Sequence, residues 1–180
     1  MNVFVLCTGR CGSVTLTEAC HFIKNYSSAH ESRTSLLGAD HFAYPPNHIE
    51  ADNRLSWFLG RLEAHYGDNA AYVHLTRDIH AVAKSYATRY DFGIMKAYQG
   101  KGILMGLPVD ADPLQVALDY CHTVNSNIKA FLKDKTKKMD FMLEEADRDF
   151  PRFCEFIGAD VDLPRALGEF HVHHNATMQK

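Results

Sequence analysis

The residues best suited to chemistry lie near the start of the chain, where an apolar run ends in a loop bounded by Gly9 and Gly12. Glycines let a backbone turn tightly with its N–H groups inward, and a helix that follows directs the positive end of its dipole at the same point. Arg10 adds a charged donor, and Ser13 and Thr15 add hydroxyl donors. The loop predicts an anion-binding site, and we expect the anion to be the 5′ phosphate of a nucleotide.

This loop differs from the Walker A loop of ATPases and GTPases, in which four residues separate the glycines and a lysine follows the second one. Here two residues separate Gly9 from Gly12, and Ser13 follows without a lysine. The difference makes an ATPase or a GTPase a weaker interpretation of the chain.

A second phosphate signal follows the apolar strand predicted over residues 71–76. Arg77 stands at the end of this strand, and a helix that begins near Ile79 places Ser85 about two turns along. The Ser85 hydroxyl could then join the Arg77 guanidinium around one bound group, while Asp78 is expected to cap the helix. Two anion sites predict a ligand with two phosphate groups.

Both signals resemble motifs of the sulfotransferases that use 3′-phosphoadenosine 5′-phosphosulfate (PAPS) as sulfuryl donor. In that family a Lys/Arg-x-Gly-Ser/Thr loop binds the 5′-phosphosulfate, and residues 10–13, Arg-Cys-Gly-Ser, are similar to it. A later strand of the family ends in an arginine followed eight positions on by a serine, which bind the 3′-phosphate, and Arg77 and Ser85 have this spacing. Weaker resemblance continues through residues 139–145 and 153–158. The family's aromatic residue after the loop is not evident, and the C-terminal Arg-Lys-Gly motif of its cytosolic animal members is missing.

The resemblance implies an enzyme, a PAPS-dependent sulfotransferase. Such an enzyme transfers a sulfuryl group in line to a hydroxyl or amine of a small-molecule or carbohydrate acceptor, without a metal, and releases 3′-phosphoadenosine 5′-phosphate (PAP). Arg10 is then the candidate for contacting the bridging or leaving oxygen, with the Ser13 hydroxyl and backbone N–H groups around the 5′ phosphate. The implied donor-binding residues are Thr8, Gly9, Arg10, Cys11, Gly12, Ser13, Val14, Thr15, Arg77 and Ser85.

Transfer to a hydroxyl also needs a general base. Members of the family place a histidine or glutamate after the second strand, where this chain has His30 and Glu31. We slightly prefer Glu31, because a carboxylate is already ionised at neutral pH, although the two could act together, one abstracting the proton and one orienting. The other titratable residues kept as alternatives are His41, His48 and Glu50.

The composition is that of an ordinary globular domain. A chain of 180 residues suits a single domain, residues 1–180, and a net charge of −3 gives no reason to expect a nucleic-acid partner. No apolar run approaches the roughly 20 residues of a membrane helix, and no export signal begins the chain, so we expect a cytoplasmic protein without membrane contact. The five scattered cysteines form no Cys-x-x-Cys pair and are expected to be free thiols.

The elements that must position these residues alternate between strand and helix patterns. This alternation predicts an α/β fold, a three-layer P-loop-like arrangement with a central parallel sheet flanked by helices and functional loops at the carboxyl ends of the strands. Strands are expected at residues 2–7, 27–30, 71–76 and 139–143, and helices at residues 14–26, 49–66, 79–90, 113–132 and 149–157. Two irregular segments, residues 32–48 and 91–112, are expected to shape the acceptor pocket.

Several alternatives stay open. The second interpretation is an ATP-dependent small-molecule kinase, which would need Mg²⁺, and the third is a non-catalytic nucleotide-binding module. Residues 171–174, His-Val-His-His, have no nearby cysteine or helical ligand pair, so we favour a polar terminal segment over a metal site. Trp57 is expected to pack in the core rather than stack on adenine, and the apolar stripe of helix 113–132 is assigned to the core, with a homodimer interface as the alternative.

Overall fold

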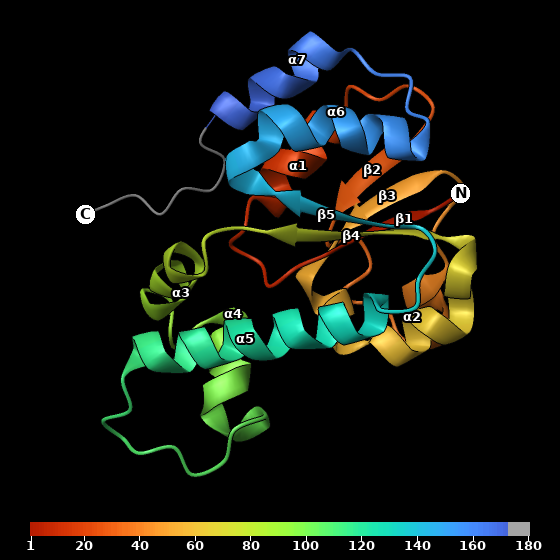
Figure 1. Ribbon diagram of the computed structural model, residues 1–180. Coiled ribbons are helices and arrows are strands. Elements are labelled where there is room, and N and C mark those ends of the chain that lie inside the picture. Colours follow the sequence, from red (N-terminus) through yellow and green to blue (C-terminus); the bar gives the residue numbers. More distant parts are fainter. Residues whose placement is uncertain (173–180) are drawn as a thin grey trace.

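The computed structural model describes residues 1–172 and contains a five-stranded sheet in the order β2-β3-β1-β4-β5 (Figure 1). All neighbouring strands of this sheet are parallel. The strands are β1 Val3–Leu6, β2 Ser27–His30, β3 His48–Ala51, β4 Ala71–Thr76 and β5 Lys138–Met142. Helices cover both faces, which confirms the three-layer α/β fold predicted from the sequence.

Within residues 1–172, three α-helices form the layer on one face of the sheet, and four form the layer on the other face. The layer above the sheet in Figure 1 consists of α1 Ser13–Cys20, α6 Ala146–Ile157 and α7 Leu163–Gly168. The layer below consists of α2 Leu59–Tyr66, α3 Ile79–Ala87, α4 Gly93–Ala97 and α5 Pro113–Leu132, in which α3 and α5 pack against each other. Shorter helical turns are η1 Gly38–Phe42, η2 Asn53–Trp57, η3 Gly67–Asn69, η4 Tyr98–Gly102, η5 Leu143–Glu145 and η6 Glu169–His171.

β1 and β4 form the centre of the sheet. Every residue of β1 and the first five residues of β4 are buried. Strands covered on both faces have nearly continuous apolar sequences, which is why both strands are visible in the sequence. Their register pairs Val3 with Ala71 and Leu6 with His74, so the loop after β1 and Arg77 after β4 emerge at the same edge of the sheet.

β3 replaces the first part of the helix predicted over residues 49–66, so that prediction is wrong before residue 59. The strand pairs with β1 on one side and β2 on the other, and all four of its residues are buried. The turn η2 then separates β3 from α2. A four-residue strand is too short to show a period of its own, whereas Leu55, Leu59 and Leu62 have helical spacing.

Other helix boundaries also differ from those predicted from the sequence. α1 ends at Cys20 rather than residue 26, because Ile23 forms an antiparallel bridge with Val161. The segment 91–112 is less irregular than expected, since it contains α4 and the π-helical turn η4. All five cysteines are buried and free, as expected. Within residues 1–172 no helix is both long and apolar enough to cross a membrane.

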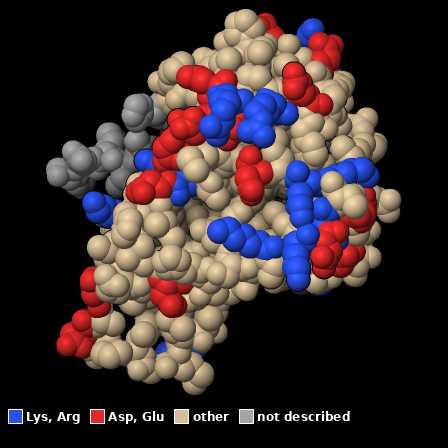
Figure 2. All heavy atoms as spheres, in the orientation of Figure 1, with Lys and Arg blue, Asp and Glu red and all other residues tan. Residues whose placement is uncertain are grey.

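Charged groups of both signs lie together on the face that carries β5 (Figure 2). Arg148 and Arg152 both contact the carboxylate of Asp149, at 2.9 and 3.1 Å, and Lys135 pairs with Glu63. Carboxylates therefore accompany these basic groups.

Candidate functional site

The loop between β1 and α1 has the backbone geometry of an anion-binding turn. Gly9, Arg10 and Gly12 have positive φ angles of 79°, 58° and 86°. A Cβ atom at Gly9 would overlap the Tyr86 hydroxyl, and one at Gly12 would overlap the methyl groups of Leu143, so glycine is required at both positions. The turn leads directly into α1, whose first N–H groups have no partner within the helix.

Neutral side-chain hydroxyl groups hold this loop in place through hydrogen bonds to its backbone carbonyls. The carbonyl oxygen of Thr8 accepts hydrogen bonds from the hydroxyls of Tyr86, at 2.6 Å, and Tyr120, at 2.8 Å. Ser56 donates to the carbonyl of Cys7 at 3.1 Å. Burial raises the pKa of both tyrosines, so their hydroxyls remain protonated donors. The sequence analysis missed these anchors, which come from three separate elements and share no motif.

The two predicted phosphate motifs meet at one edge of the sheet. Arg10 Nε donates to Ser85 Oγ at 3.0 Å, and Arg77 Nη1 donates to the carbonyl of Arg10 at 3.4 Å. Ser85 was expected beside Arg77, but its hydroxyl contacts Arg10 instead. The pKa of Arg10 is lowered mainly by burial and then by nearby Arg89 and Arg77. The loop 8–15 and the segment from Arg77 to Ser85 therefore form one cationic region.

His30, at the end of β2, lies against the loop between β1 and α1. Its Nε2 is 3.0 Å from Ser13 Oγ at the start of α1. Burial lowers the pKa of His30, and the nearby carboxylates of Glu31 and Glu50 partly oppose this shift. The imidazole is consequently neutral at neutral pH, which is the form that can accept a proton.

Glu31 follows β2 and has a different environment from His30. Its φ angle is 50°, and its carboxylate forms an ion pair with Arg54 of η2. Its backbone N–H donates to the carbonyl of Ala51 at 3.1 Å. Of the two candidate bases, His30 contacts Ser13 at the start of α1, whereas the carboxylate of Glu31 pairs with Arg54.

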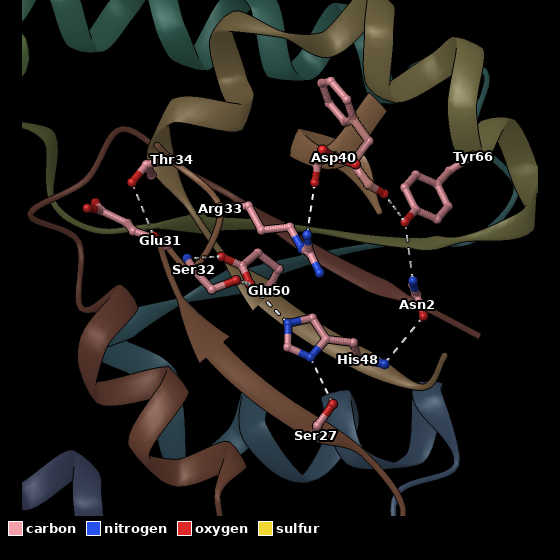
Figure 3. A network of polar contacts seen from close by, with 11 residues as sticks. Asn2, Ser27, Glu31, Ser32, Arg33, Thr34, Asp40, His48, Glu50 and Tyr66 are labelled. Carbon is pink, nitrogen blue, oxygen red and sulfur yellow. Dashed lines mark hydrogen bonds and ion pairs between the residues drawn. The ribbon is translucent and has the colours of Figure 1, made fainter. Parts of the chain in front are cut away.

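A network of polar contacts through the buried side chains of His48 and Glu50 fixes both ends of β2 (Figure 3). Glu50, which has no exposed surface, accepts hydrogen bonds from the N–H and the hydroxyl of Ser32, both at 2.7 Å. Glu50 Oε2, the oxygen that accepts from the Ser32 hydroxyl, also lies 2.9 Å from His48 Nε2, and His48 Nδ1 lies 2.8 Å from Ser27 Oγ. His48 and Glu50, two of the alternative bases, are therefore occupied in holding the strand that carries His30.

The remaining expectations concern side chains away from this edge. His41 Nδ1 lies 3.1 Å from the carbonyl of Leu36, and Trp57 packs on Tyr98 and Tyr120 with ring centroids 6.4 Å from each, as expected of a core residue.

Within the part of the chain that the structure describes, no three His, Cys, Asp or Glu side chains gather into a group that could hold a metal ion. Two histidines of the cluster at 171–174, residues 173 and 174, lie outside the described residues.

No protein-family model matches the chain, and no curated protein matches its sequence. Among solved structures, the chain is similar to mouse sulfotransferase SULT7A1 complexed with PAP, with a TM-score of 0.54 and 12% sequence identity. The two chains share a fold. The similarity covers 94% of this chain and 63% of the mouse chain, so the present chain spans less than two thirds of that structure. It confirms the P-loop-like α/β architecture.

Proposed function

We propose that the protein is a sulfotransferase that takes a sulfuryl group from PAPS and transfers it to a hydroxyl or amine of a small-molecule or carbohydrate acceptor. The observation that carries the proposal is the contact between the two phosphate motifs. Arg10 Nε lies 3.0 Å from Ser85 Oγ, and Arg77 donates to the backbone of Arg10. This single cationic region suits one ligand with two phosphate groups, such as an adenosine bisphosphate.

The described residues can supply each part of an in-line transfer. The loop and Arg10 neutralise the charge that develops on the donor's 5′ phosphate as its bond to sulfur breaks. His30 accepts the proton of an acceptor hydroxyl while the acceptor oxygen forms the new bond to sulfur. The contact between His30 and Ser13 supports this role, because it places the base beside the 5′-phosphate loop. We therefore now favour His30 over Glu31, which we assign to orienting the turn through Arg54.

Calorimetry with PAP in the presence of EDTA tests the donor site. We expect tight binding that Arg10→Ala and Arg77→Ala each weaken about 10-fold or more, because each removes a charged ligand of a phosphate. Binding of ATP only with Mg²⁺, and no binding of PAP, would instead identify the kinase alternative.

Incubation with labelled PAPS and an acceptor library then tests turnover. We expect a labelled product with the parent protein and loss of that product with the variants that lose PAP. Tight binding of PAP without any product across the library would favour the non-catalytic module.

A further inference from the structure

A third guanidinium lies on the same side of α3 as the predicted phosphate ligands. Arg89 continues the helical path beyond α3, because its N–H donates to the carbonyl of Tyr86 at 2.9 Å. Ser85 precedes Arg89 by four residues and Tyr86 precedes it by three, and residues at these spacings share a helix face. Ser85 contacts Arg10, and Tyr86 contacts the carbonyl of Thr8. Arg89 therefore belongs to the face of α3 that covers the phosphate loop.

The electrostatics agree with this placement. Arg89 is the nearby cation that most lowers the pKa of Arg10, ahead of Arg77. Arg89 is partly buried, and among residues 1–172 no carboxylate lies within ion-pair distance of it. Glu144 lies 3.9 Å from Arg77 Nε. Three guanidinium groups in one region repel one another, and a bound anion with several charges would relieve that repulsion.

We propose that Arg89 is a third arginine ligand of the bound nucleotide and that, with Arg77 and Ser85, it holds the 3′-phosphate. The proposal rests on the proposed function for the identity of that phosphate. A phosphate monoester carries up to two negative charges and several acceptor oxygens, so two guanidinium groups and a hydroxyl can bind it together. Arg89 would then help the protein to select nucleotides that carry a 3′-phosphate over those that lack it.

Calorimetry of Arg89→Ala with two nucleotides tests this assignment. PAP carries the 3′-phosphate, whereas adenosine 5′-phosphate lacks it. We expect the variant to bind PAP about 10-fold or more weakly and to bind adenosine 5′-phosphate within about 3-fold of the parent, since one charged hydrogen-bonded contact is lost. Arg89→Lys should fall between parent and alanine variant, because it keeps the charge and loses the planar fork.

Lys84→Ala is the matched control. Lys84 is an exposed cation on α3 next to Ser85, so its removal changes the net charge equally without touching the proposed ligand set. We expect it to change the affinity for either nucleotide by less than about 2-fold at physiological salt, where exposed charges are screened. Circular dichroism and thermal unfolding of each variant establish that it is folded before binding is compared.

Two results would overturn the assignment of Arg89. Equal losses for Arg89→Ala and Lys84→Ala would mean that only long-range charge matters, and equal losses for both nucleotides would place Arg89 at the 5′ phosphate. If the parent does not prefer PAP to adenosine 5′-phosphate, the proposed function fails instead, and Arg89 is then tested with inorganic sulfate. A shift of its Nε–Hε NMR signal during that titration would support a role as anion ligand, and an unmoved signal would refute it.

Discussion

The loop between β1 and α1 and the turn at the end of β2 meet where Ser13 contacts His30, yet groups of different chemistry hold them. Neutral hydroxyls that donate to backbone carbonyls hold the loop, as the bonds from Tyr86 and Tyr120 to Thr8 show. The turn is held by ionisable groups. Glu50 binds Ser32 and His48, and Glu31 pairs with Arg54.

The difference implies that the two regions respond differently to pH. Protonated tyrosines with raised pKa values do not titrate near neutral pH, so the geometry of the loop should not change there. Burial lowers the pKa of His30, and its imidazole can accept a proton only in the neutral form, so acidification through this lowered pKa removes the base. We therefore expect the geometry of the loop to be independent of pH and turnover to depend on it, and the following predictions test that contrast in order of expected effect.

His30→Gln should have the largest effect on turnover. Loss of a general base typically slows a reaction by about 100-fold or more, whereas the Ser13 hydroxyl remains available to the donor phosphate. We expect kcat with labelled PAPS to fall by this factor while the affinity for PAP, measured by calorimetry, changes less than about 3-fold. Glu31→Gln is the comparison, and a larger loss of kcat there would return the role of base to Glu31.

Glu50→Ala should destabilise the turn more than any other single change. It leaves the N–H and hydroxyl of Ser32 and the buried ring of His48 without their acceptor, and the loss of a buried hydrogen-bond partner costs about 1–3 kcal/mol. Urea unfolding measures this loss. Glu50→Gln keeps one acceptor oxygen and should cost less, and an equal loss in both variants would show that the charge rather than the hydrogen bonds matters.

Asp52→Asn should remove a pH dependence of stability. Burial, reinforced by Glu31 and Glu50, raises the pKa of Asp52 from 3.8 to about 6. Because the folded-state pKa lies above the unfolded value, the favourable contribution is complete below pH 3.8 and is lost as the pH rises through about 6, a cost of about 3 kcal/mol at pH 7. The asparagine variant should therefore gain stability over the parent between pH 4 and pH 7.

Unfolding of both proteins in urea at several pH values measures this difference. The comparison isolates Asp52, since His30 titrates in both proteins and its lowered pKa acts with the opposite sign. A constant difference across the range would contradict the assignment of a raised pKa to this carboxyl.

Tyr120→Phe should have the smallest effect. It removes one of the two hydroxyls that donate to Thr8 and leaves that of Tyr86, so we expect a loss of about 1 kcal/mol. The loss should be the same at pH 5 and pH 8, because burial raises the pKa of both tyrosines and neither hydroxyl titrates in this range. A loss of stability that changed with pH would contradict the prediction that the loop, unlike the turn, is insensitive to pH.

The central strands and the glycine-bounded turn after β1 were predictable because their signals are local. β1 and β4 are buried on both faces and appear as apolar runs, and Gly9 and Gly12 mark a turn with positive φ angles that glycine adopts most readily. β3 was missed because its four residues carry no period of their own. Its identity depends on pairing with β1 and β2, which are distant in the chain.

The sequence by itself determined which residues could bind phosphate, because a glycine-bounded loop and an arginine eight residues before a serine are patterns within short segments. Only the tertiary structure decided which of these residues meet. Parallel pairing brings the ends of β1, β2, β3 and β4 to one edge, where Arg10 meets Ser85, Ser13 meets His30, and Glu50 becomes a buried support instead of a base. Such contacts join segments from 17 to 75 residues apart, and the distance between them follows from strand register and helix packing rather than from local preference.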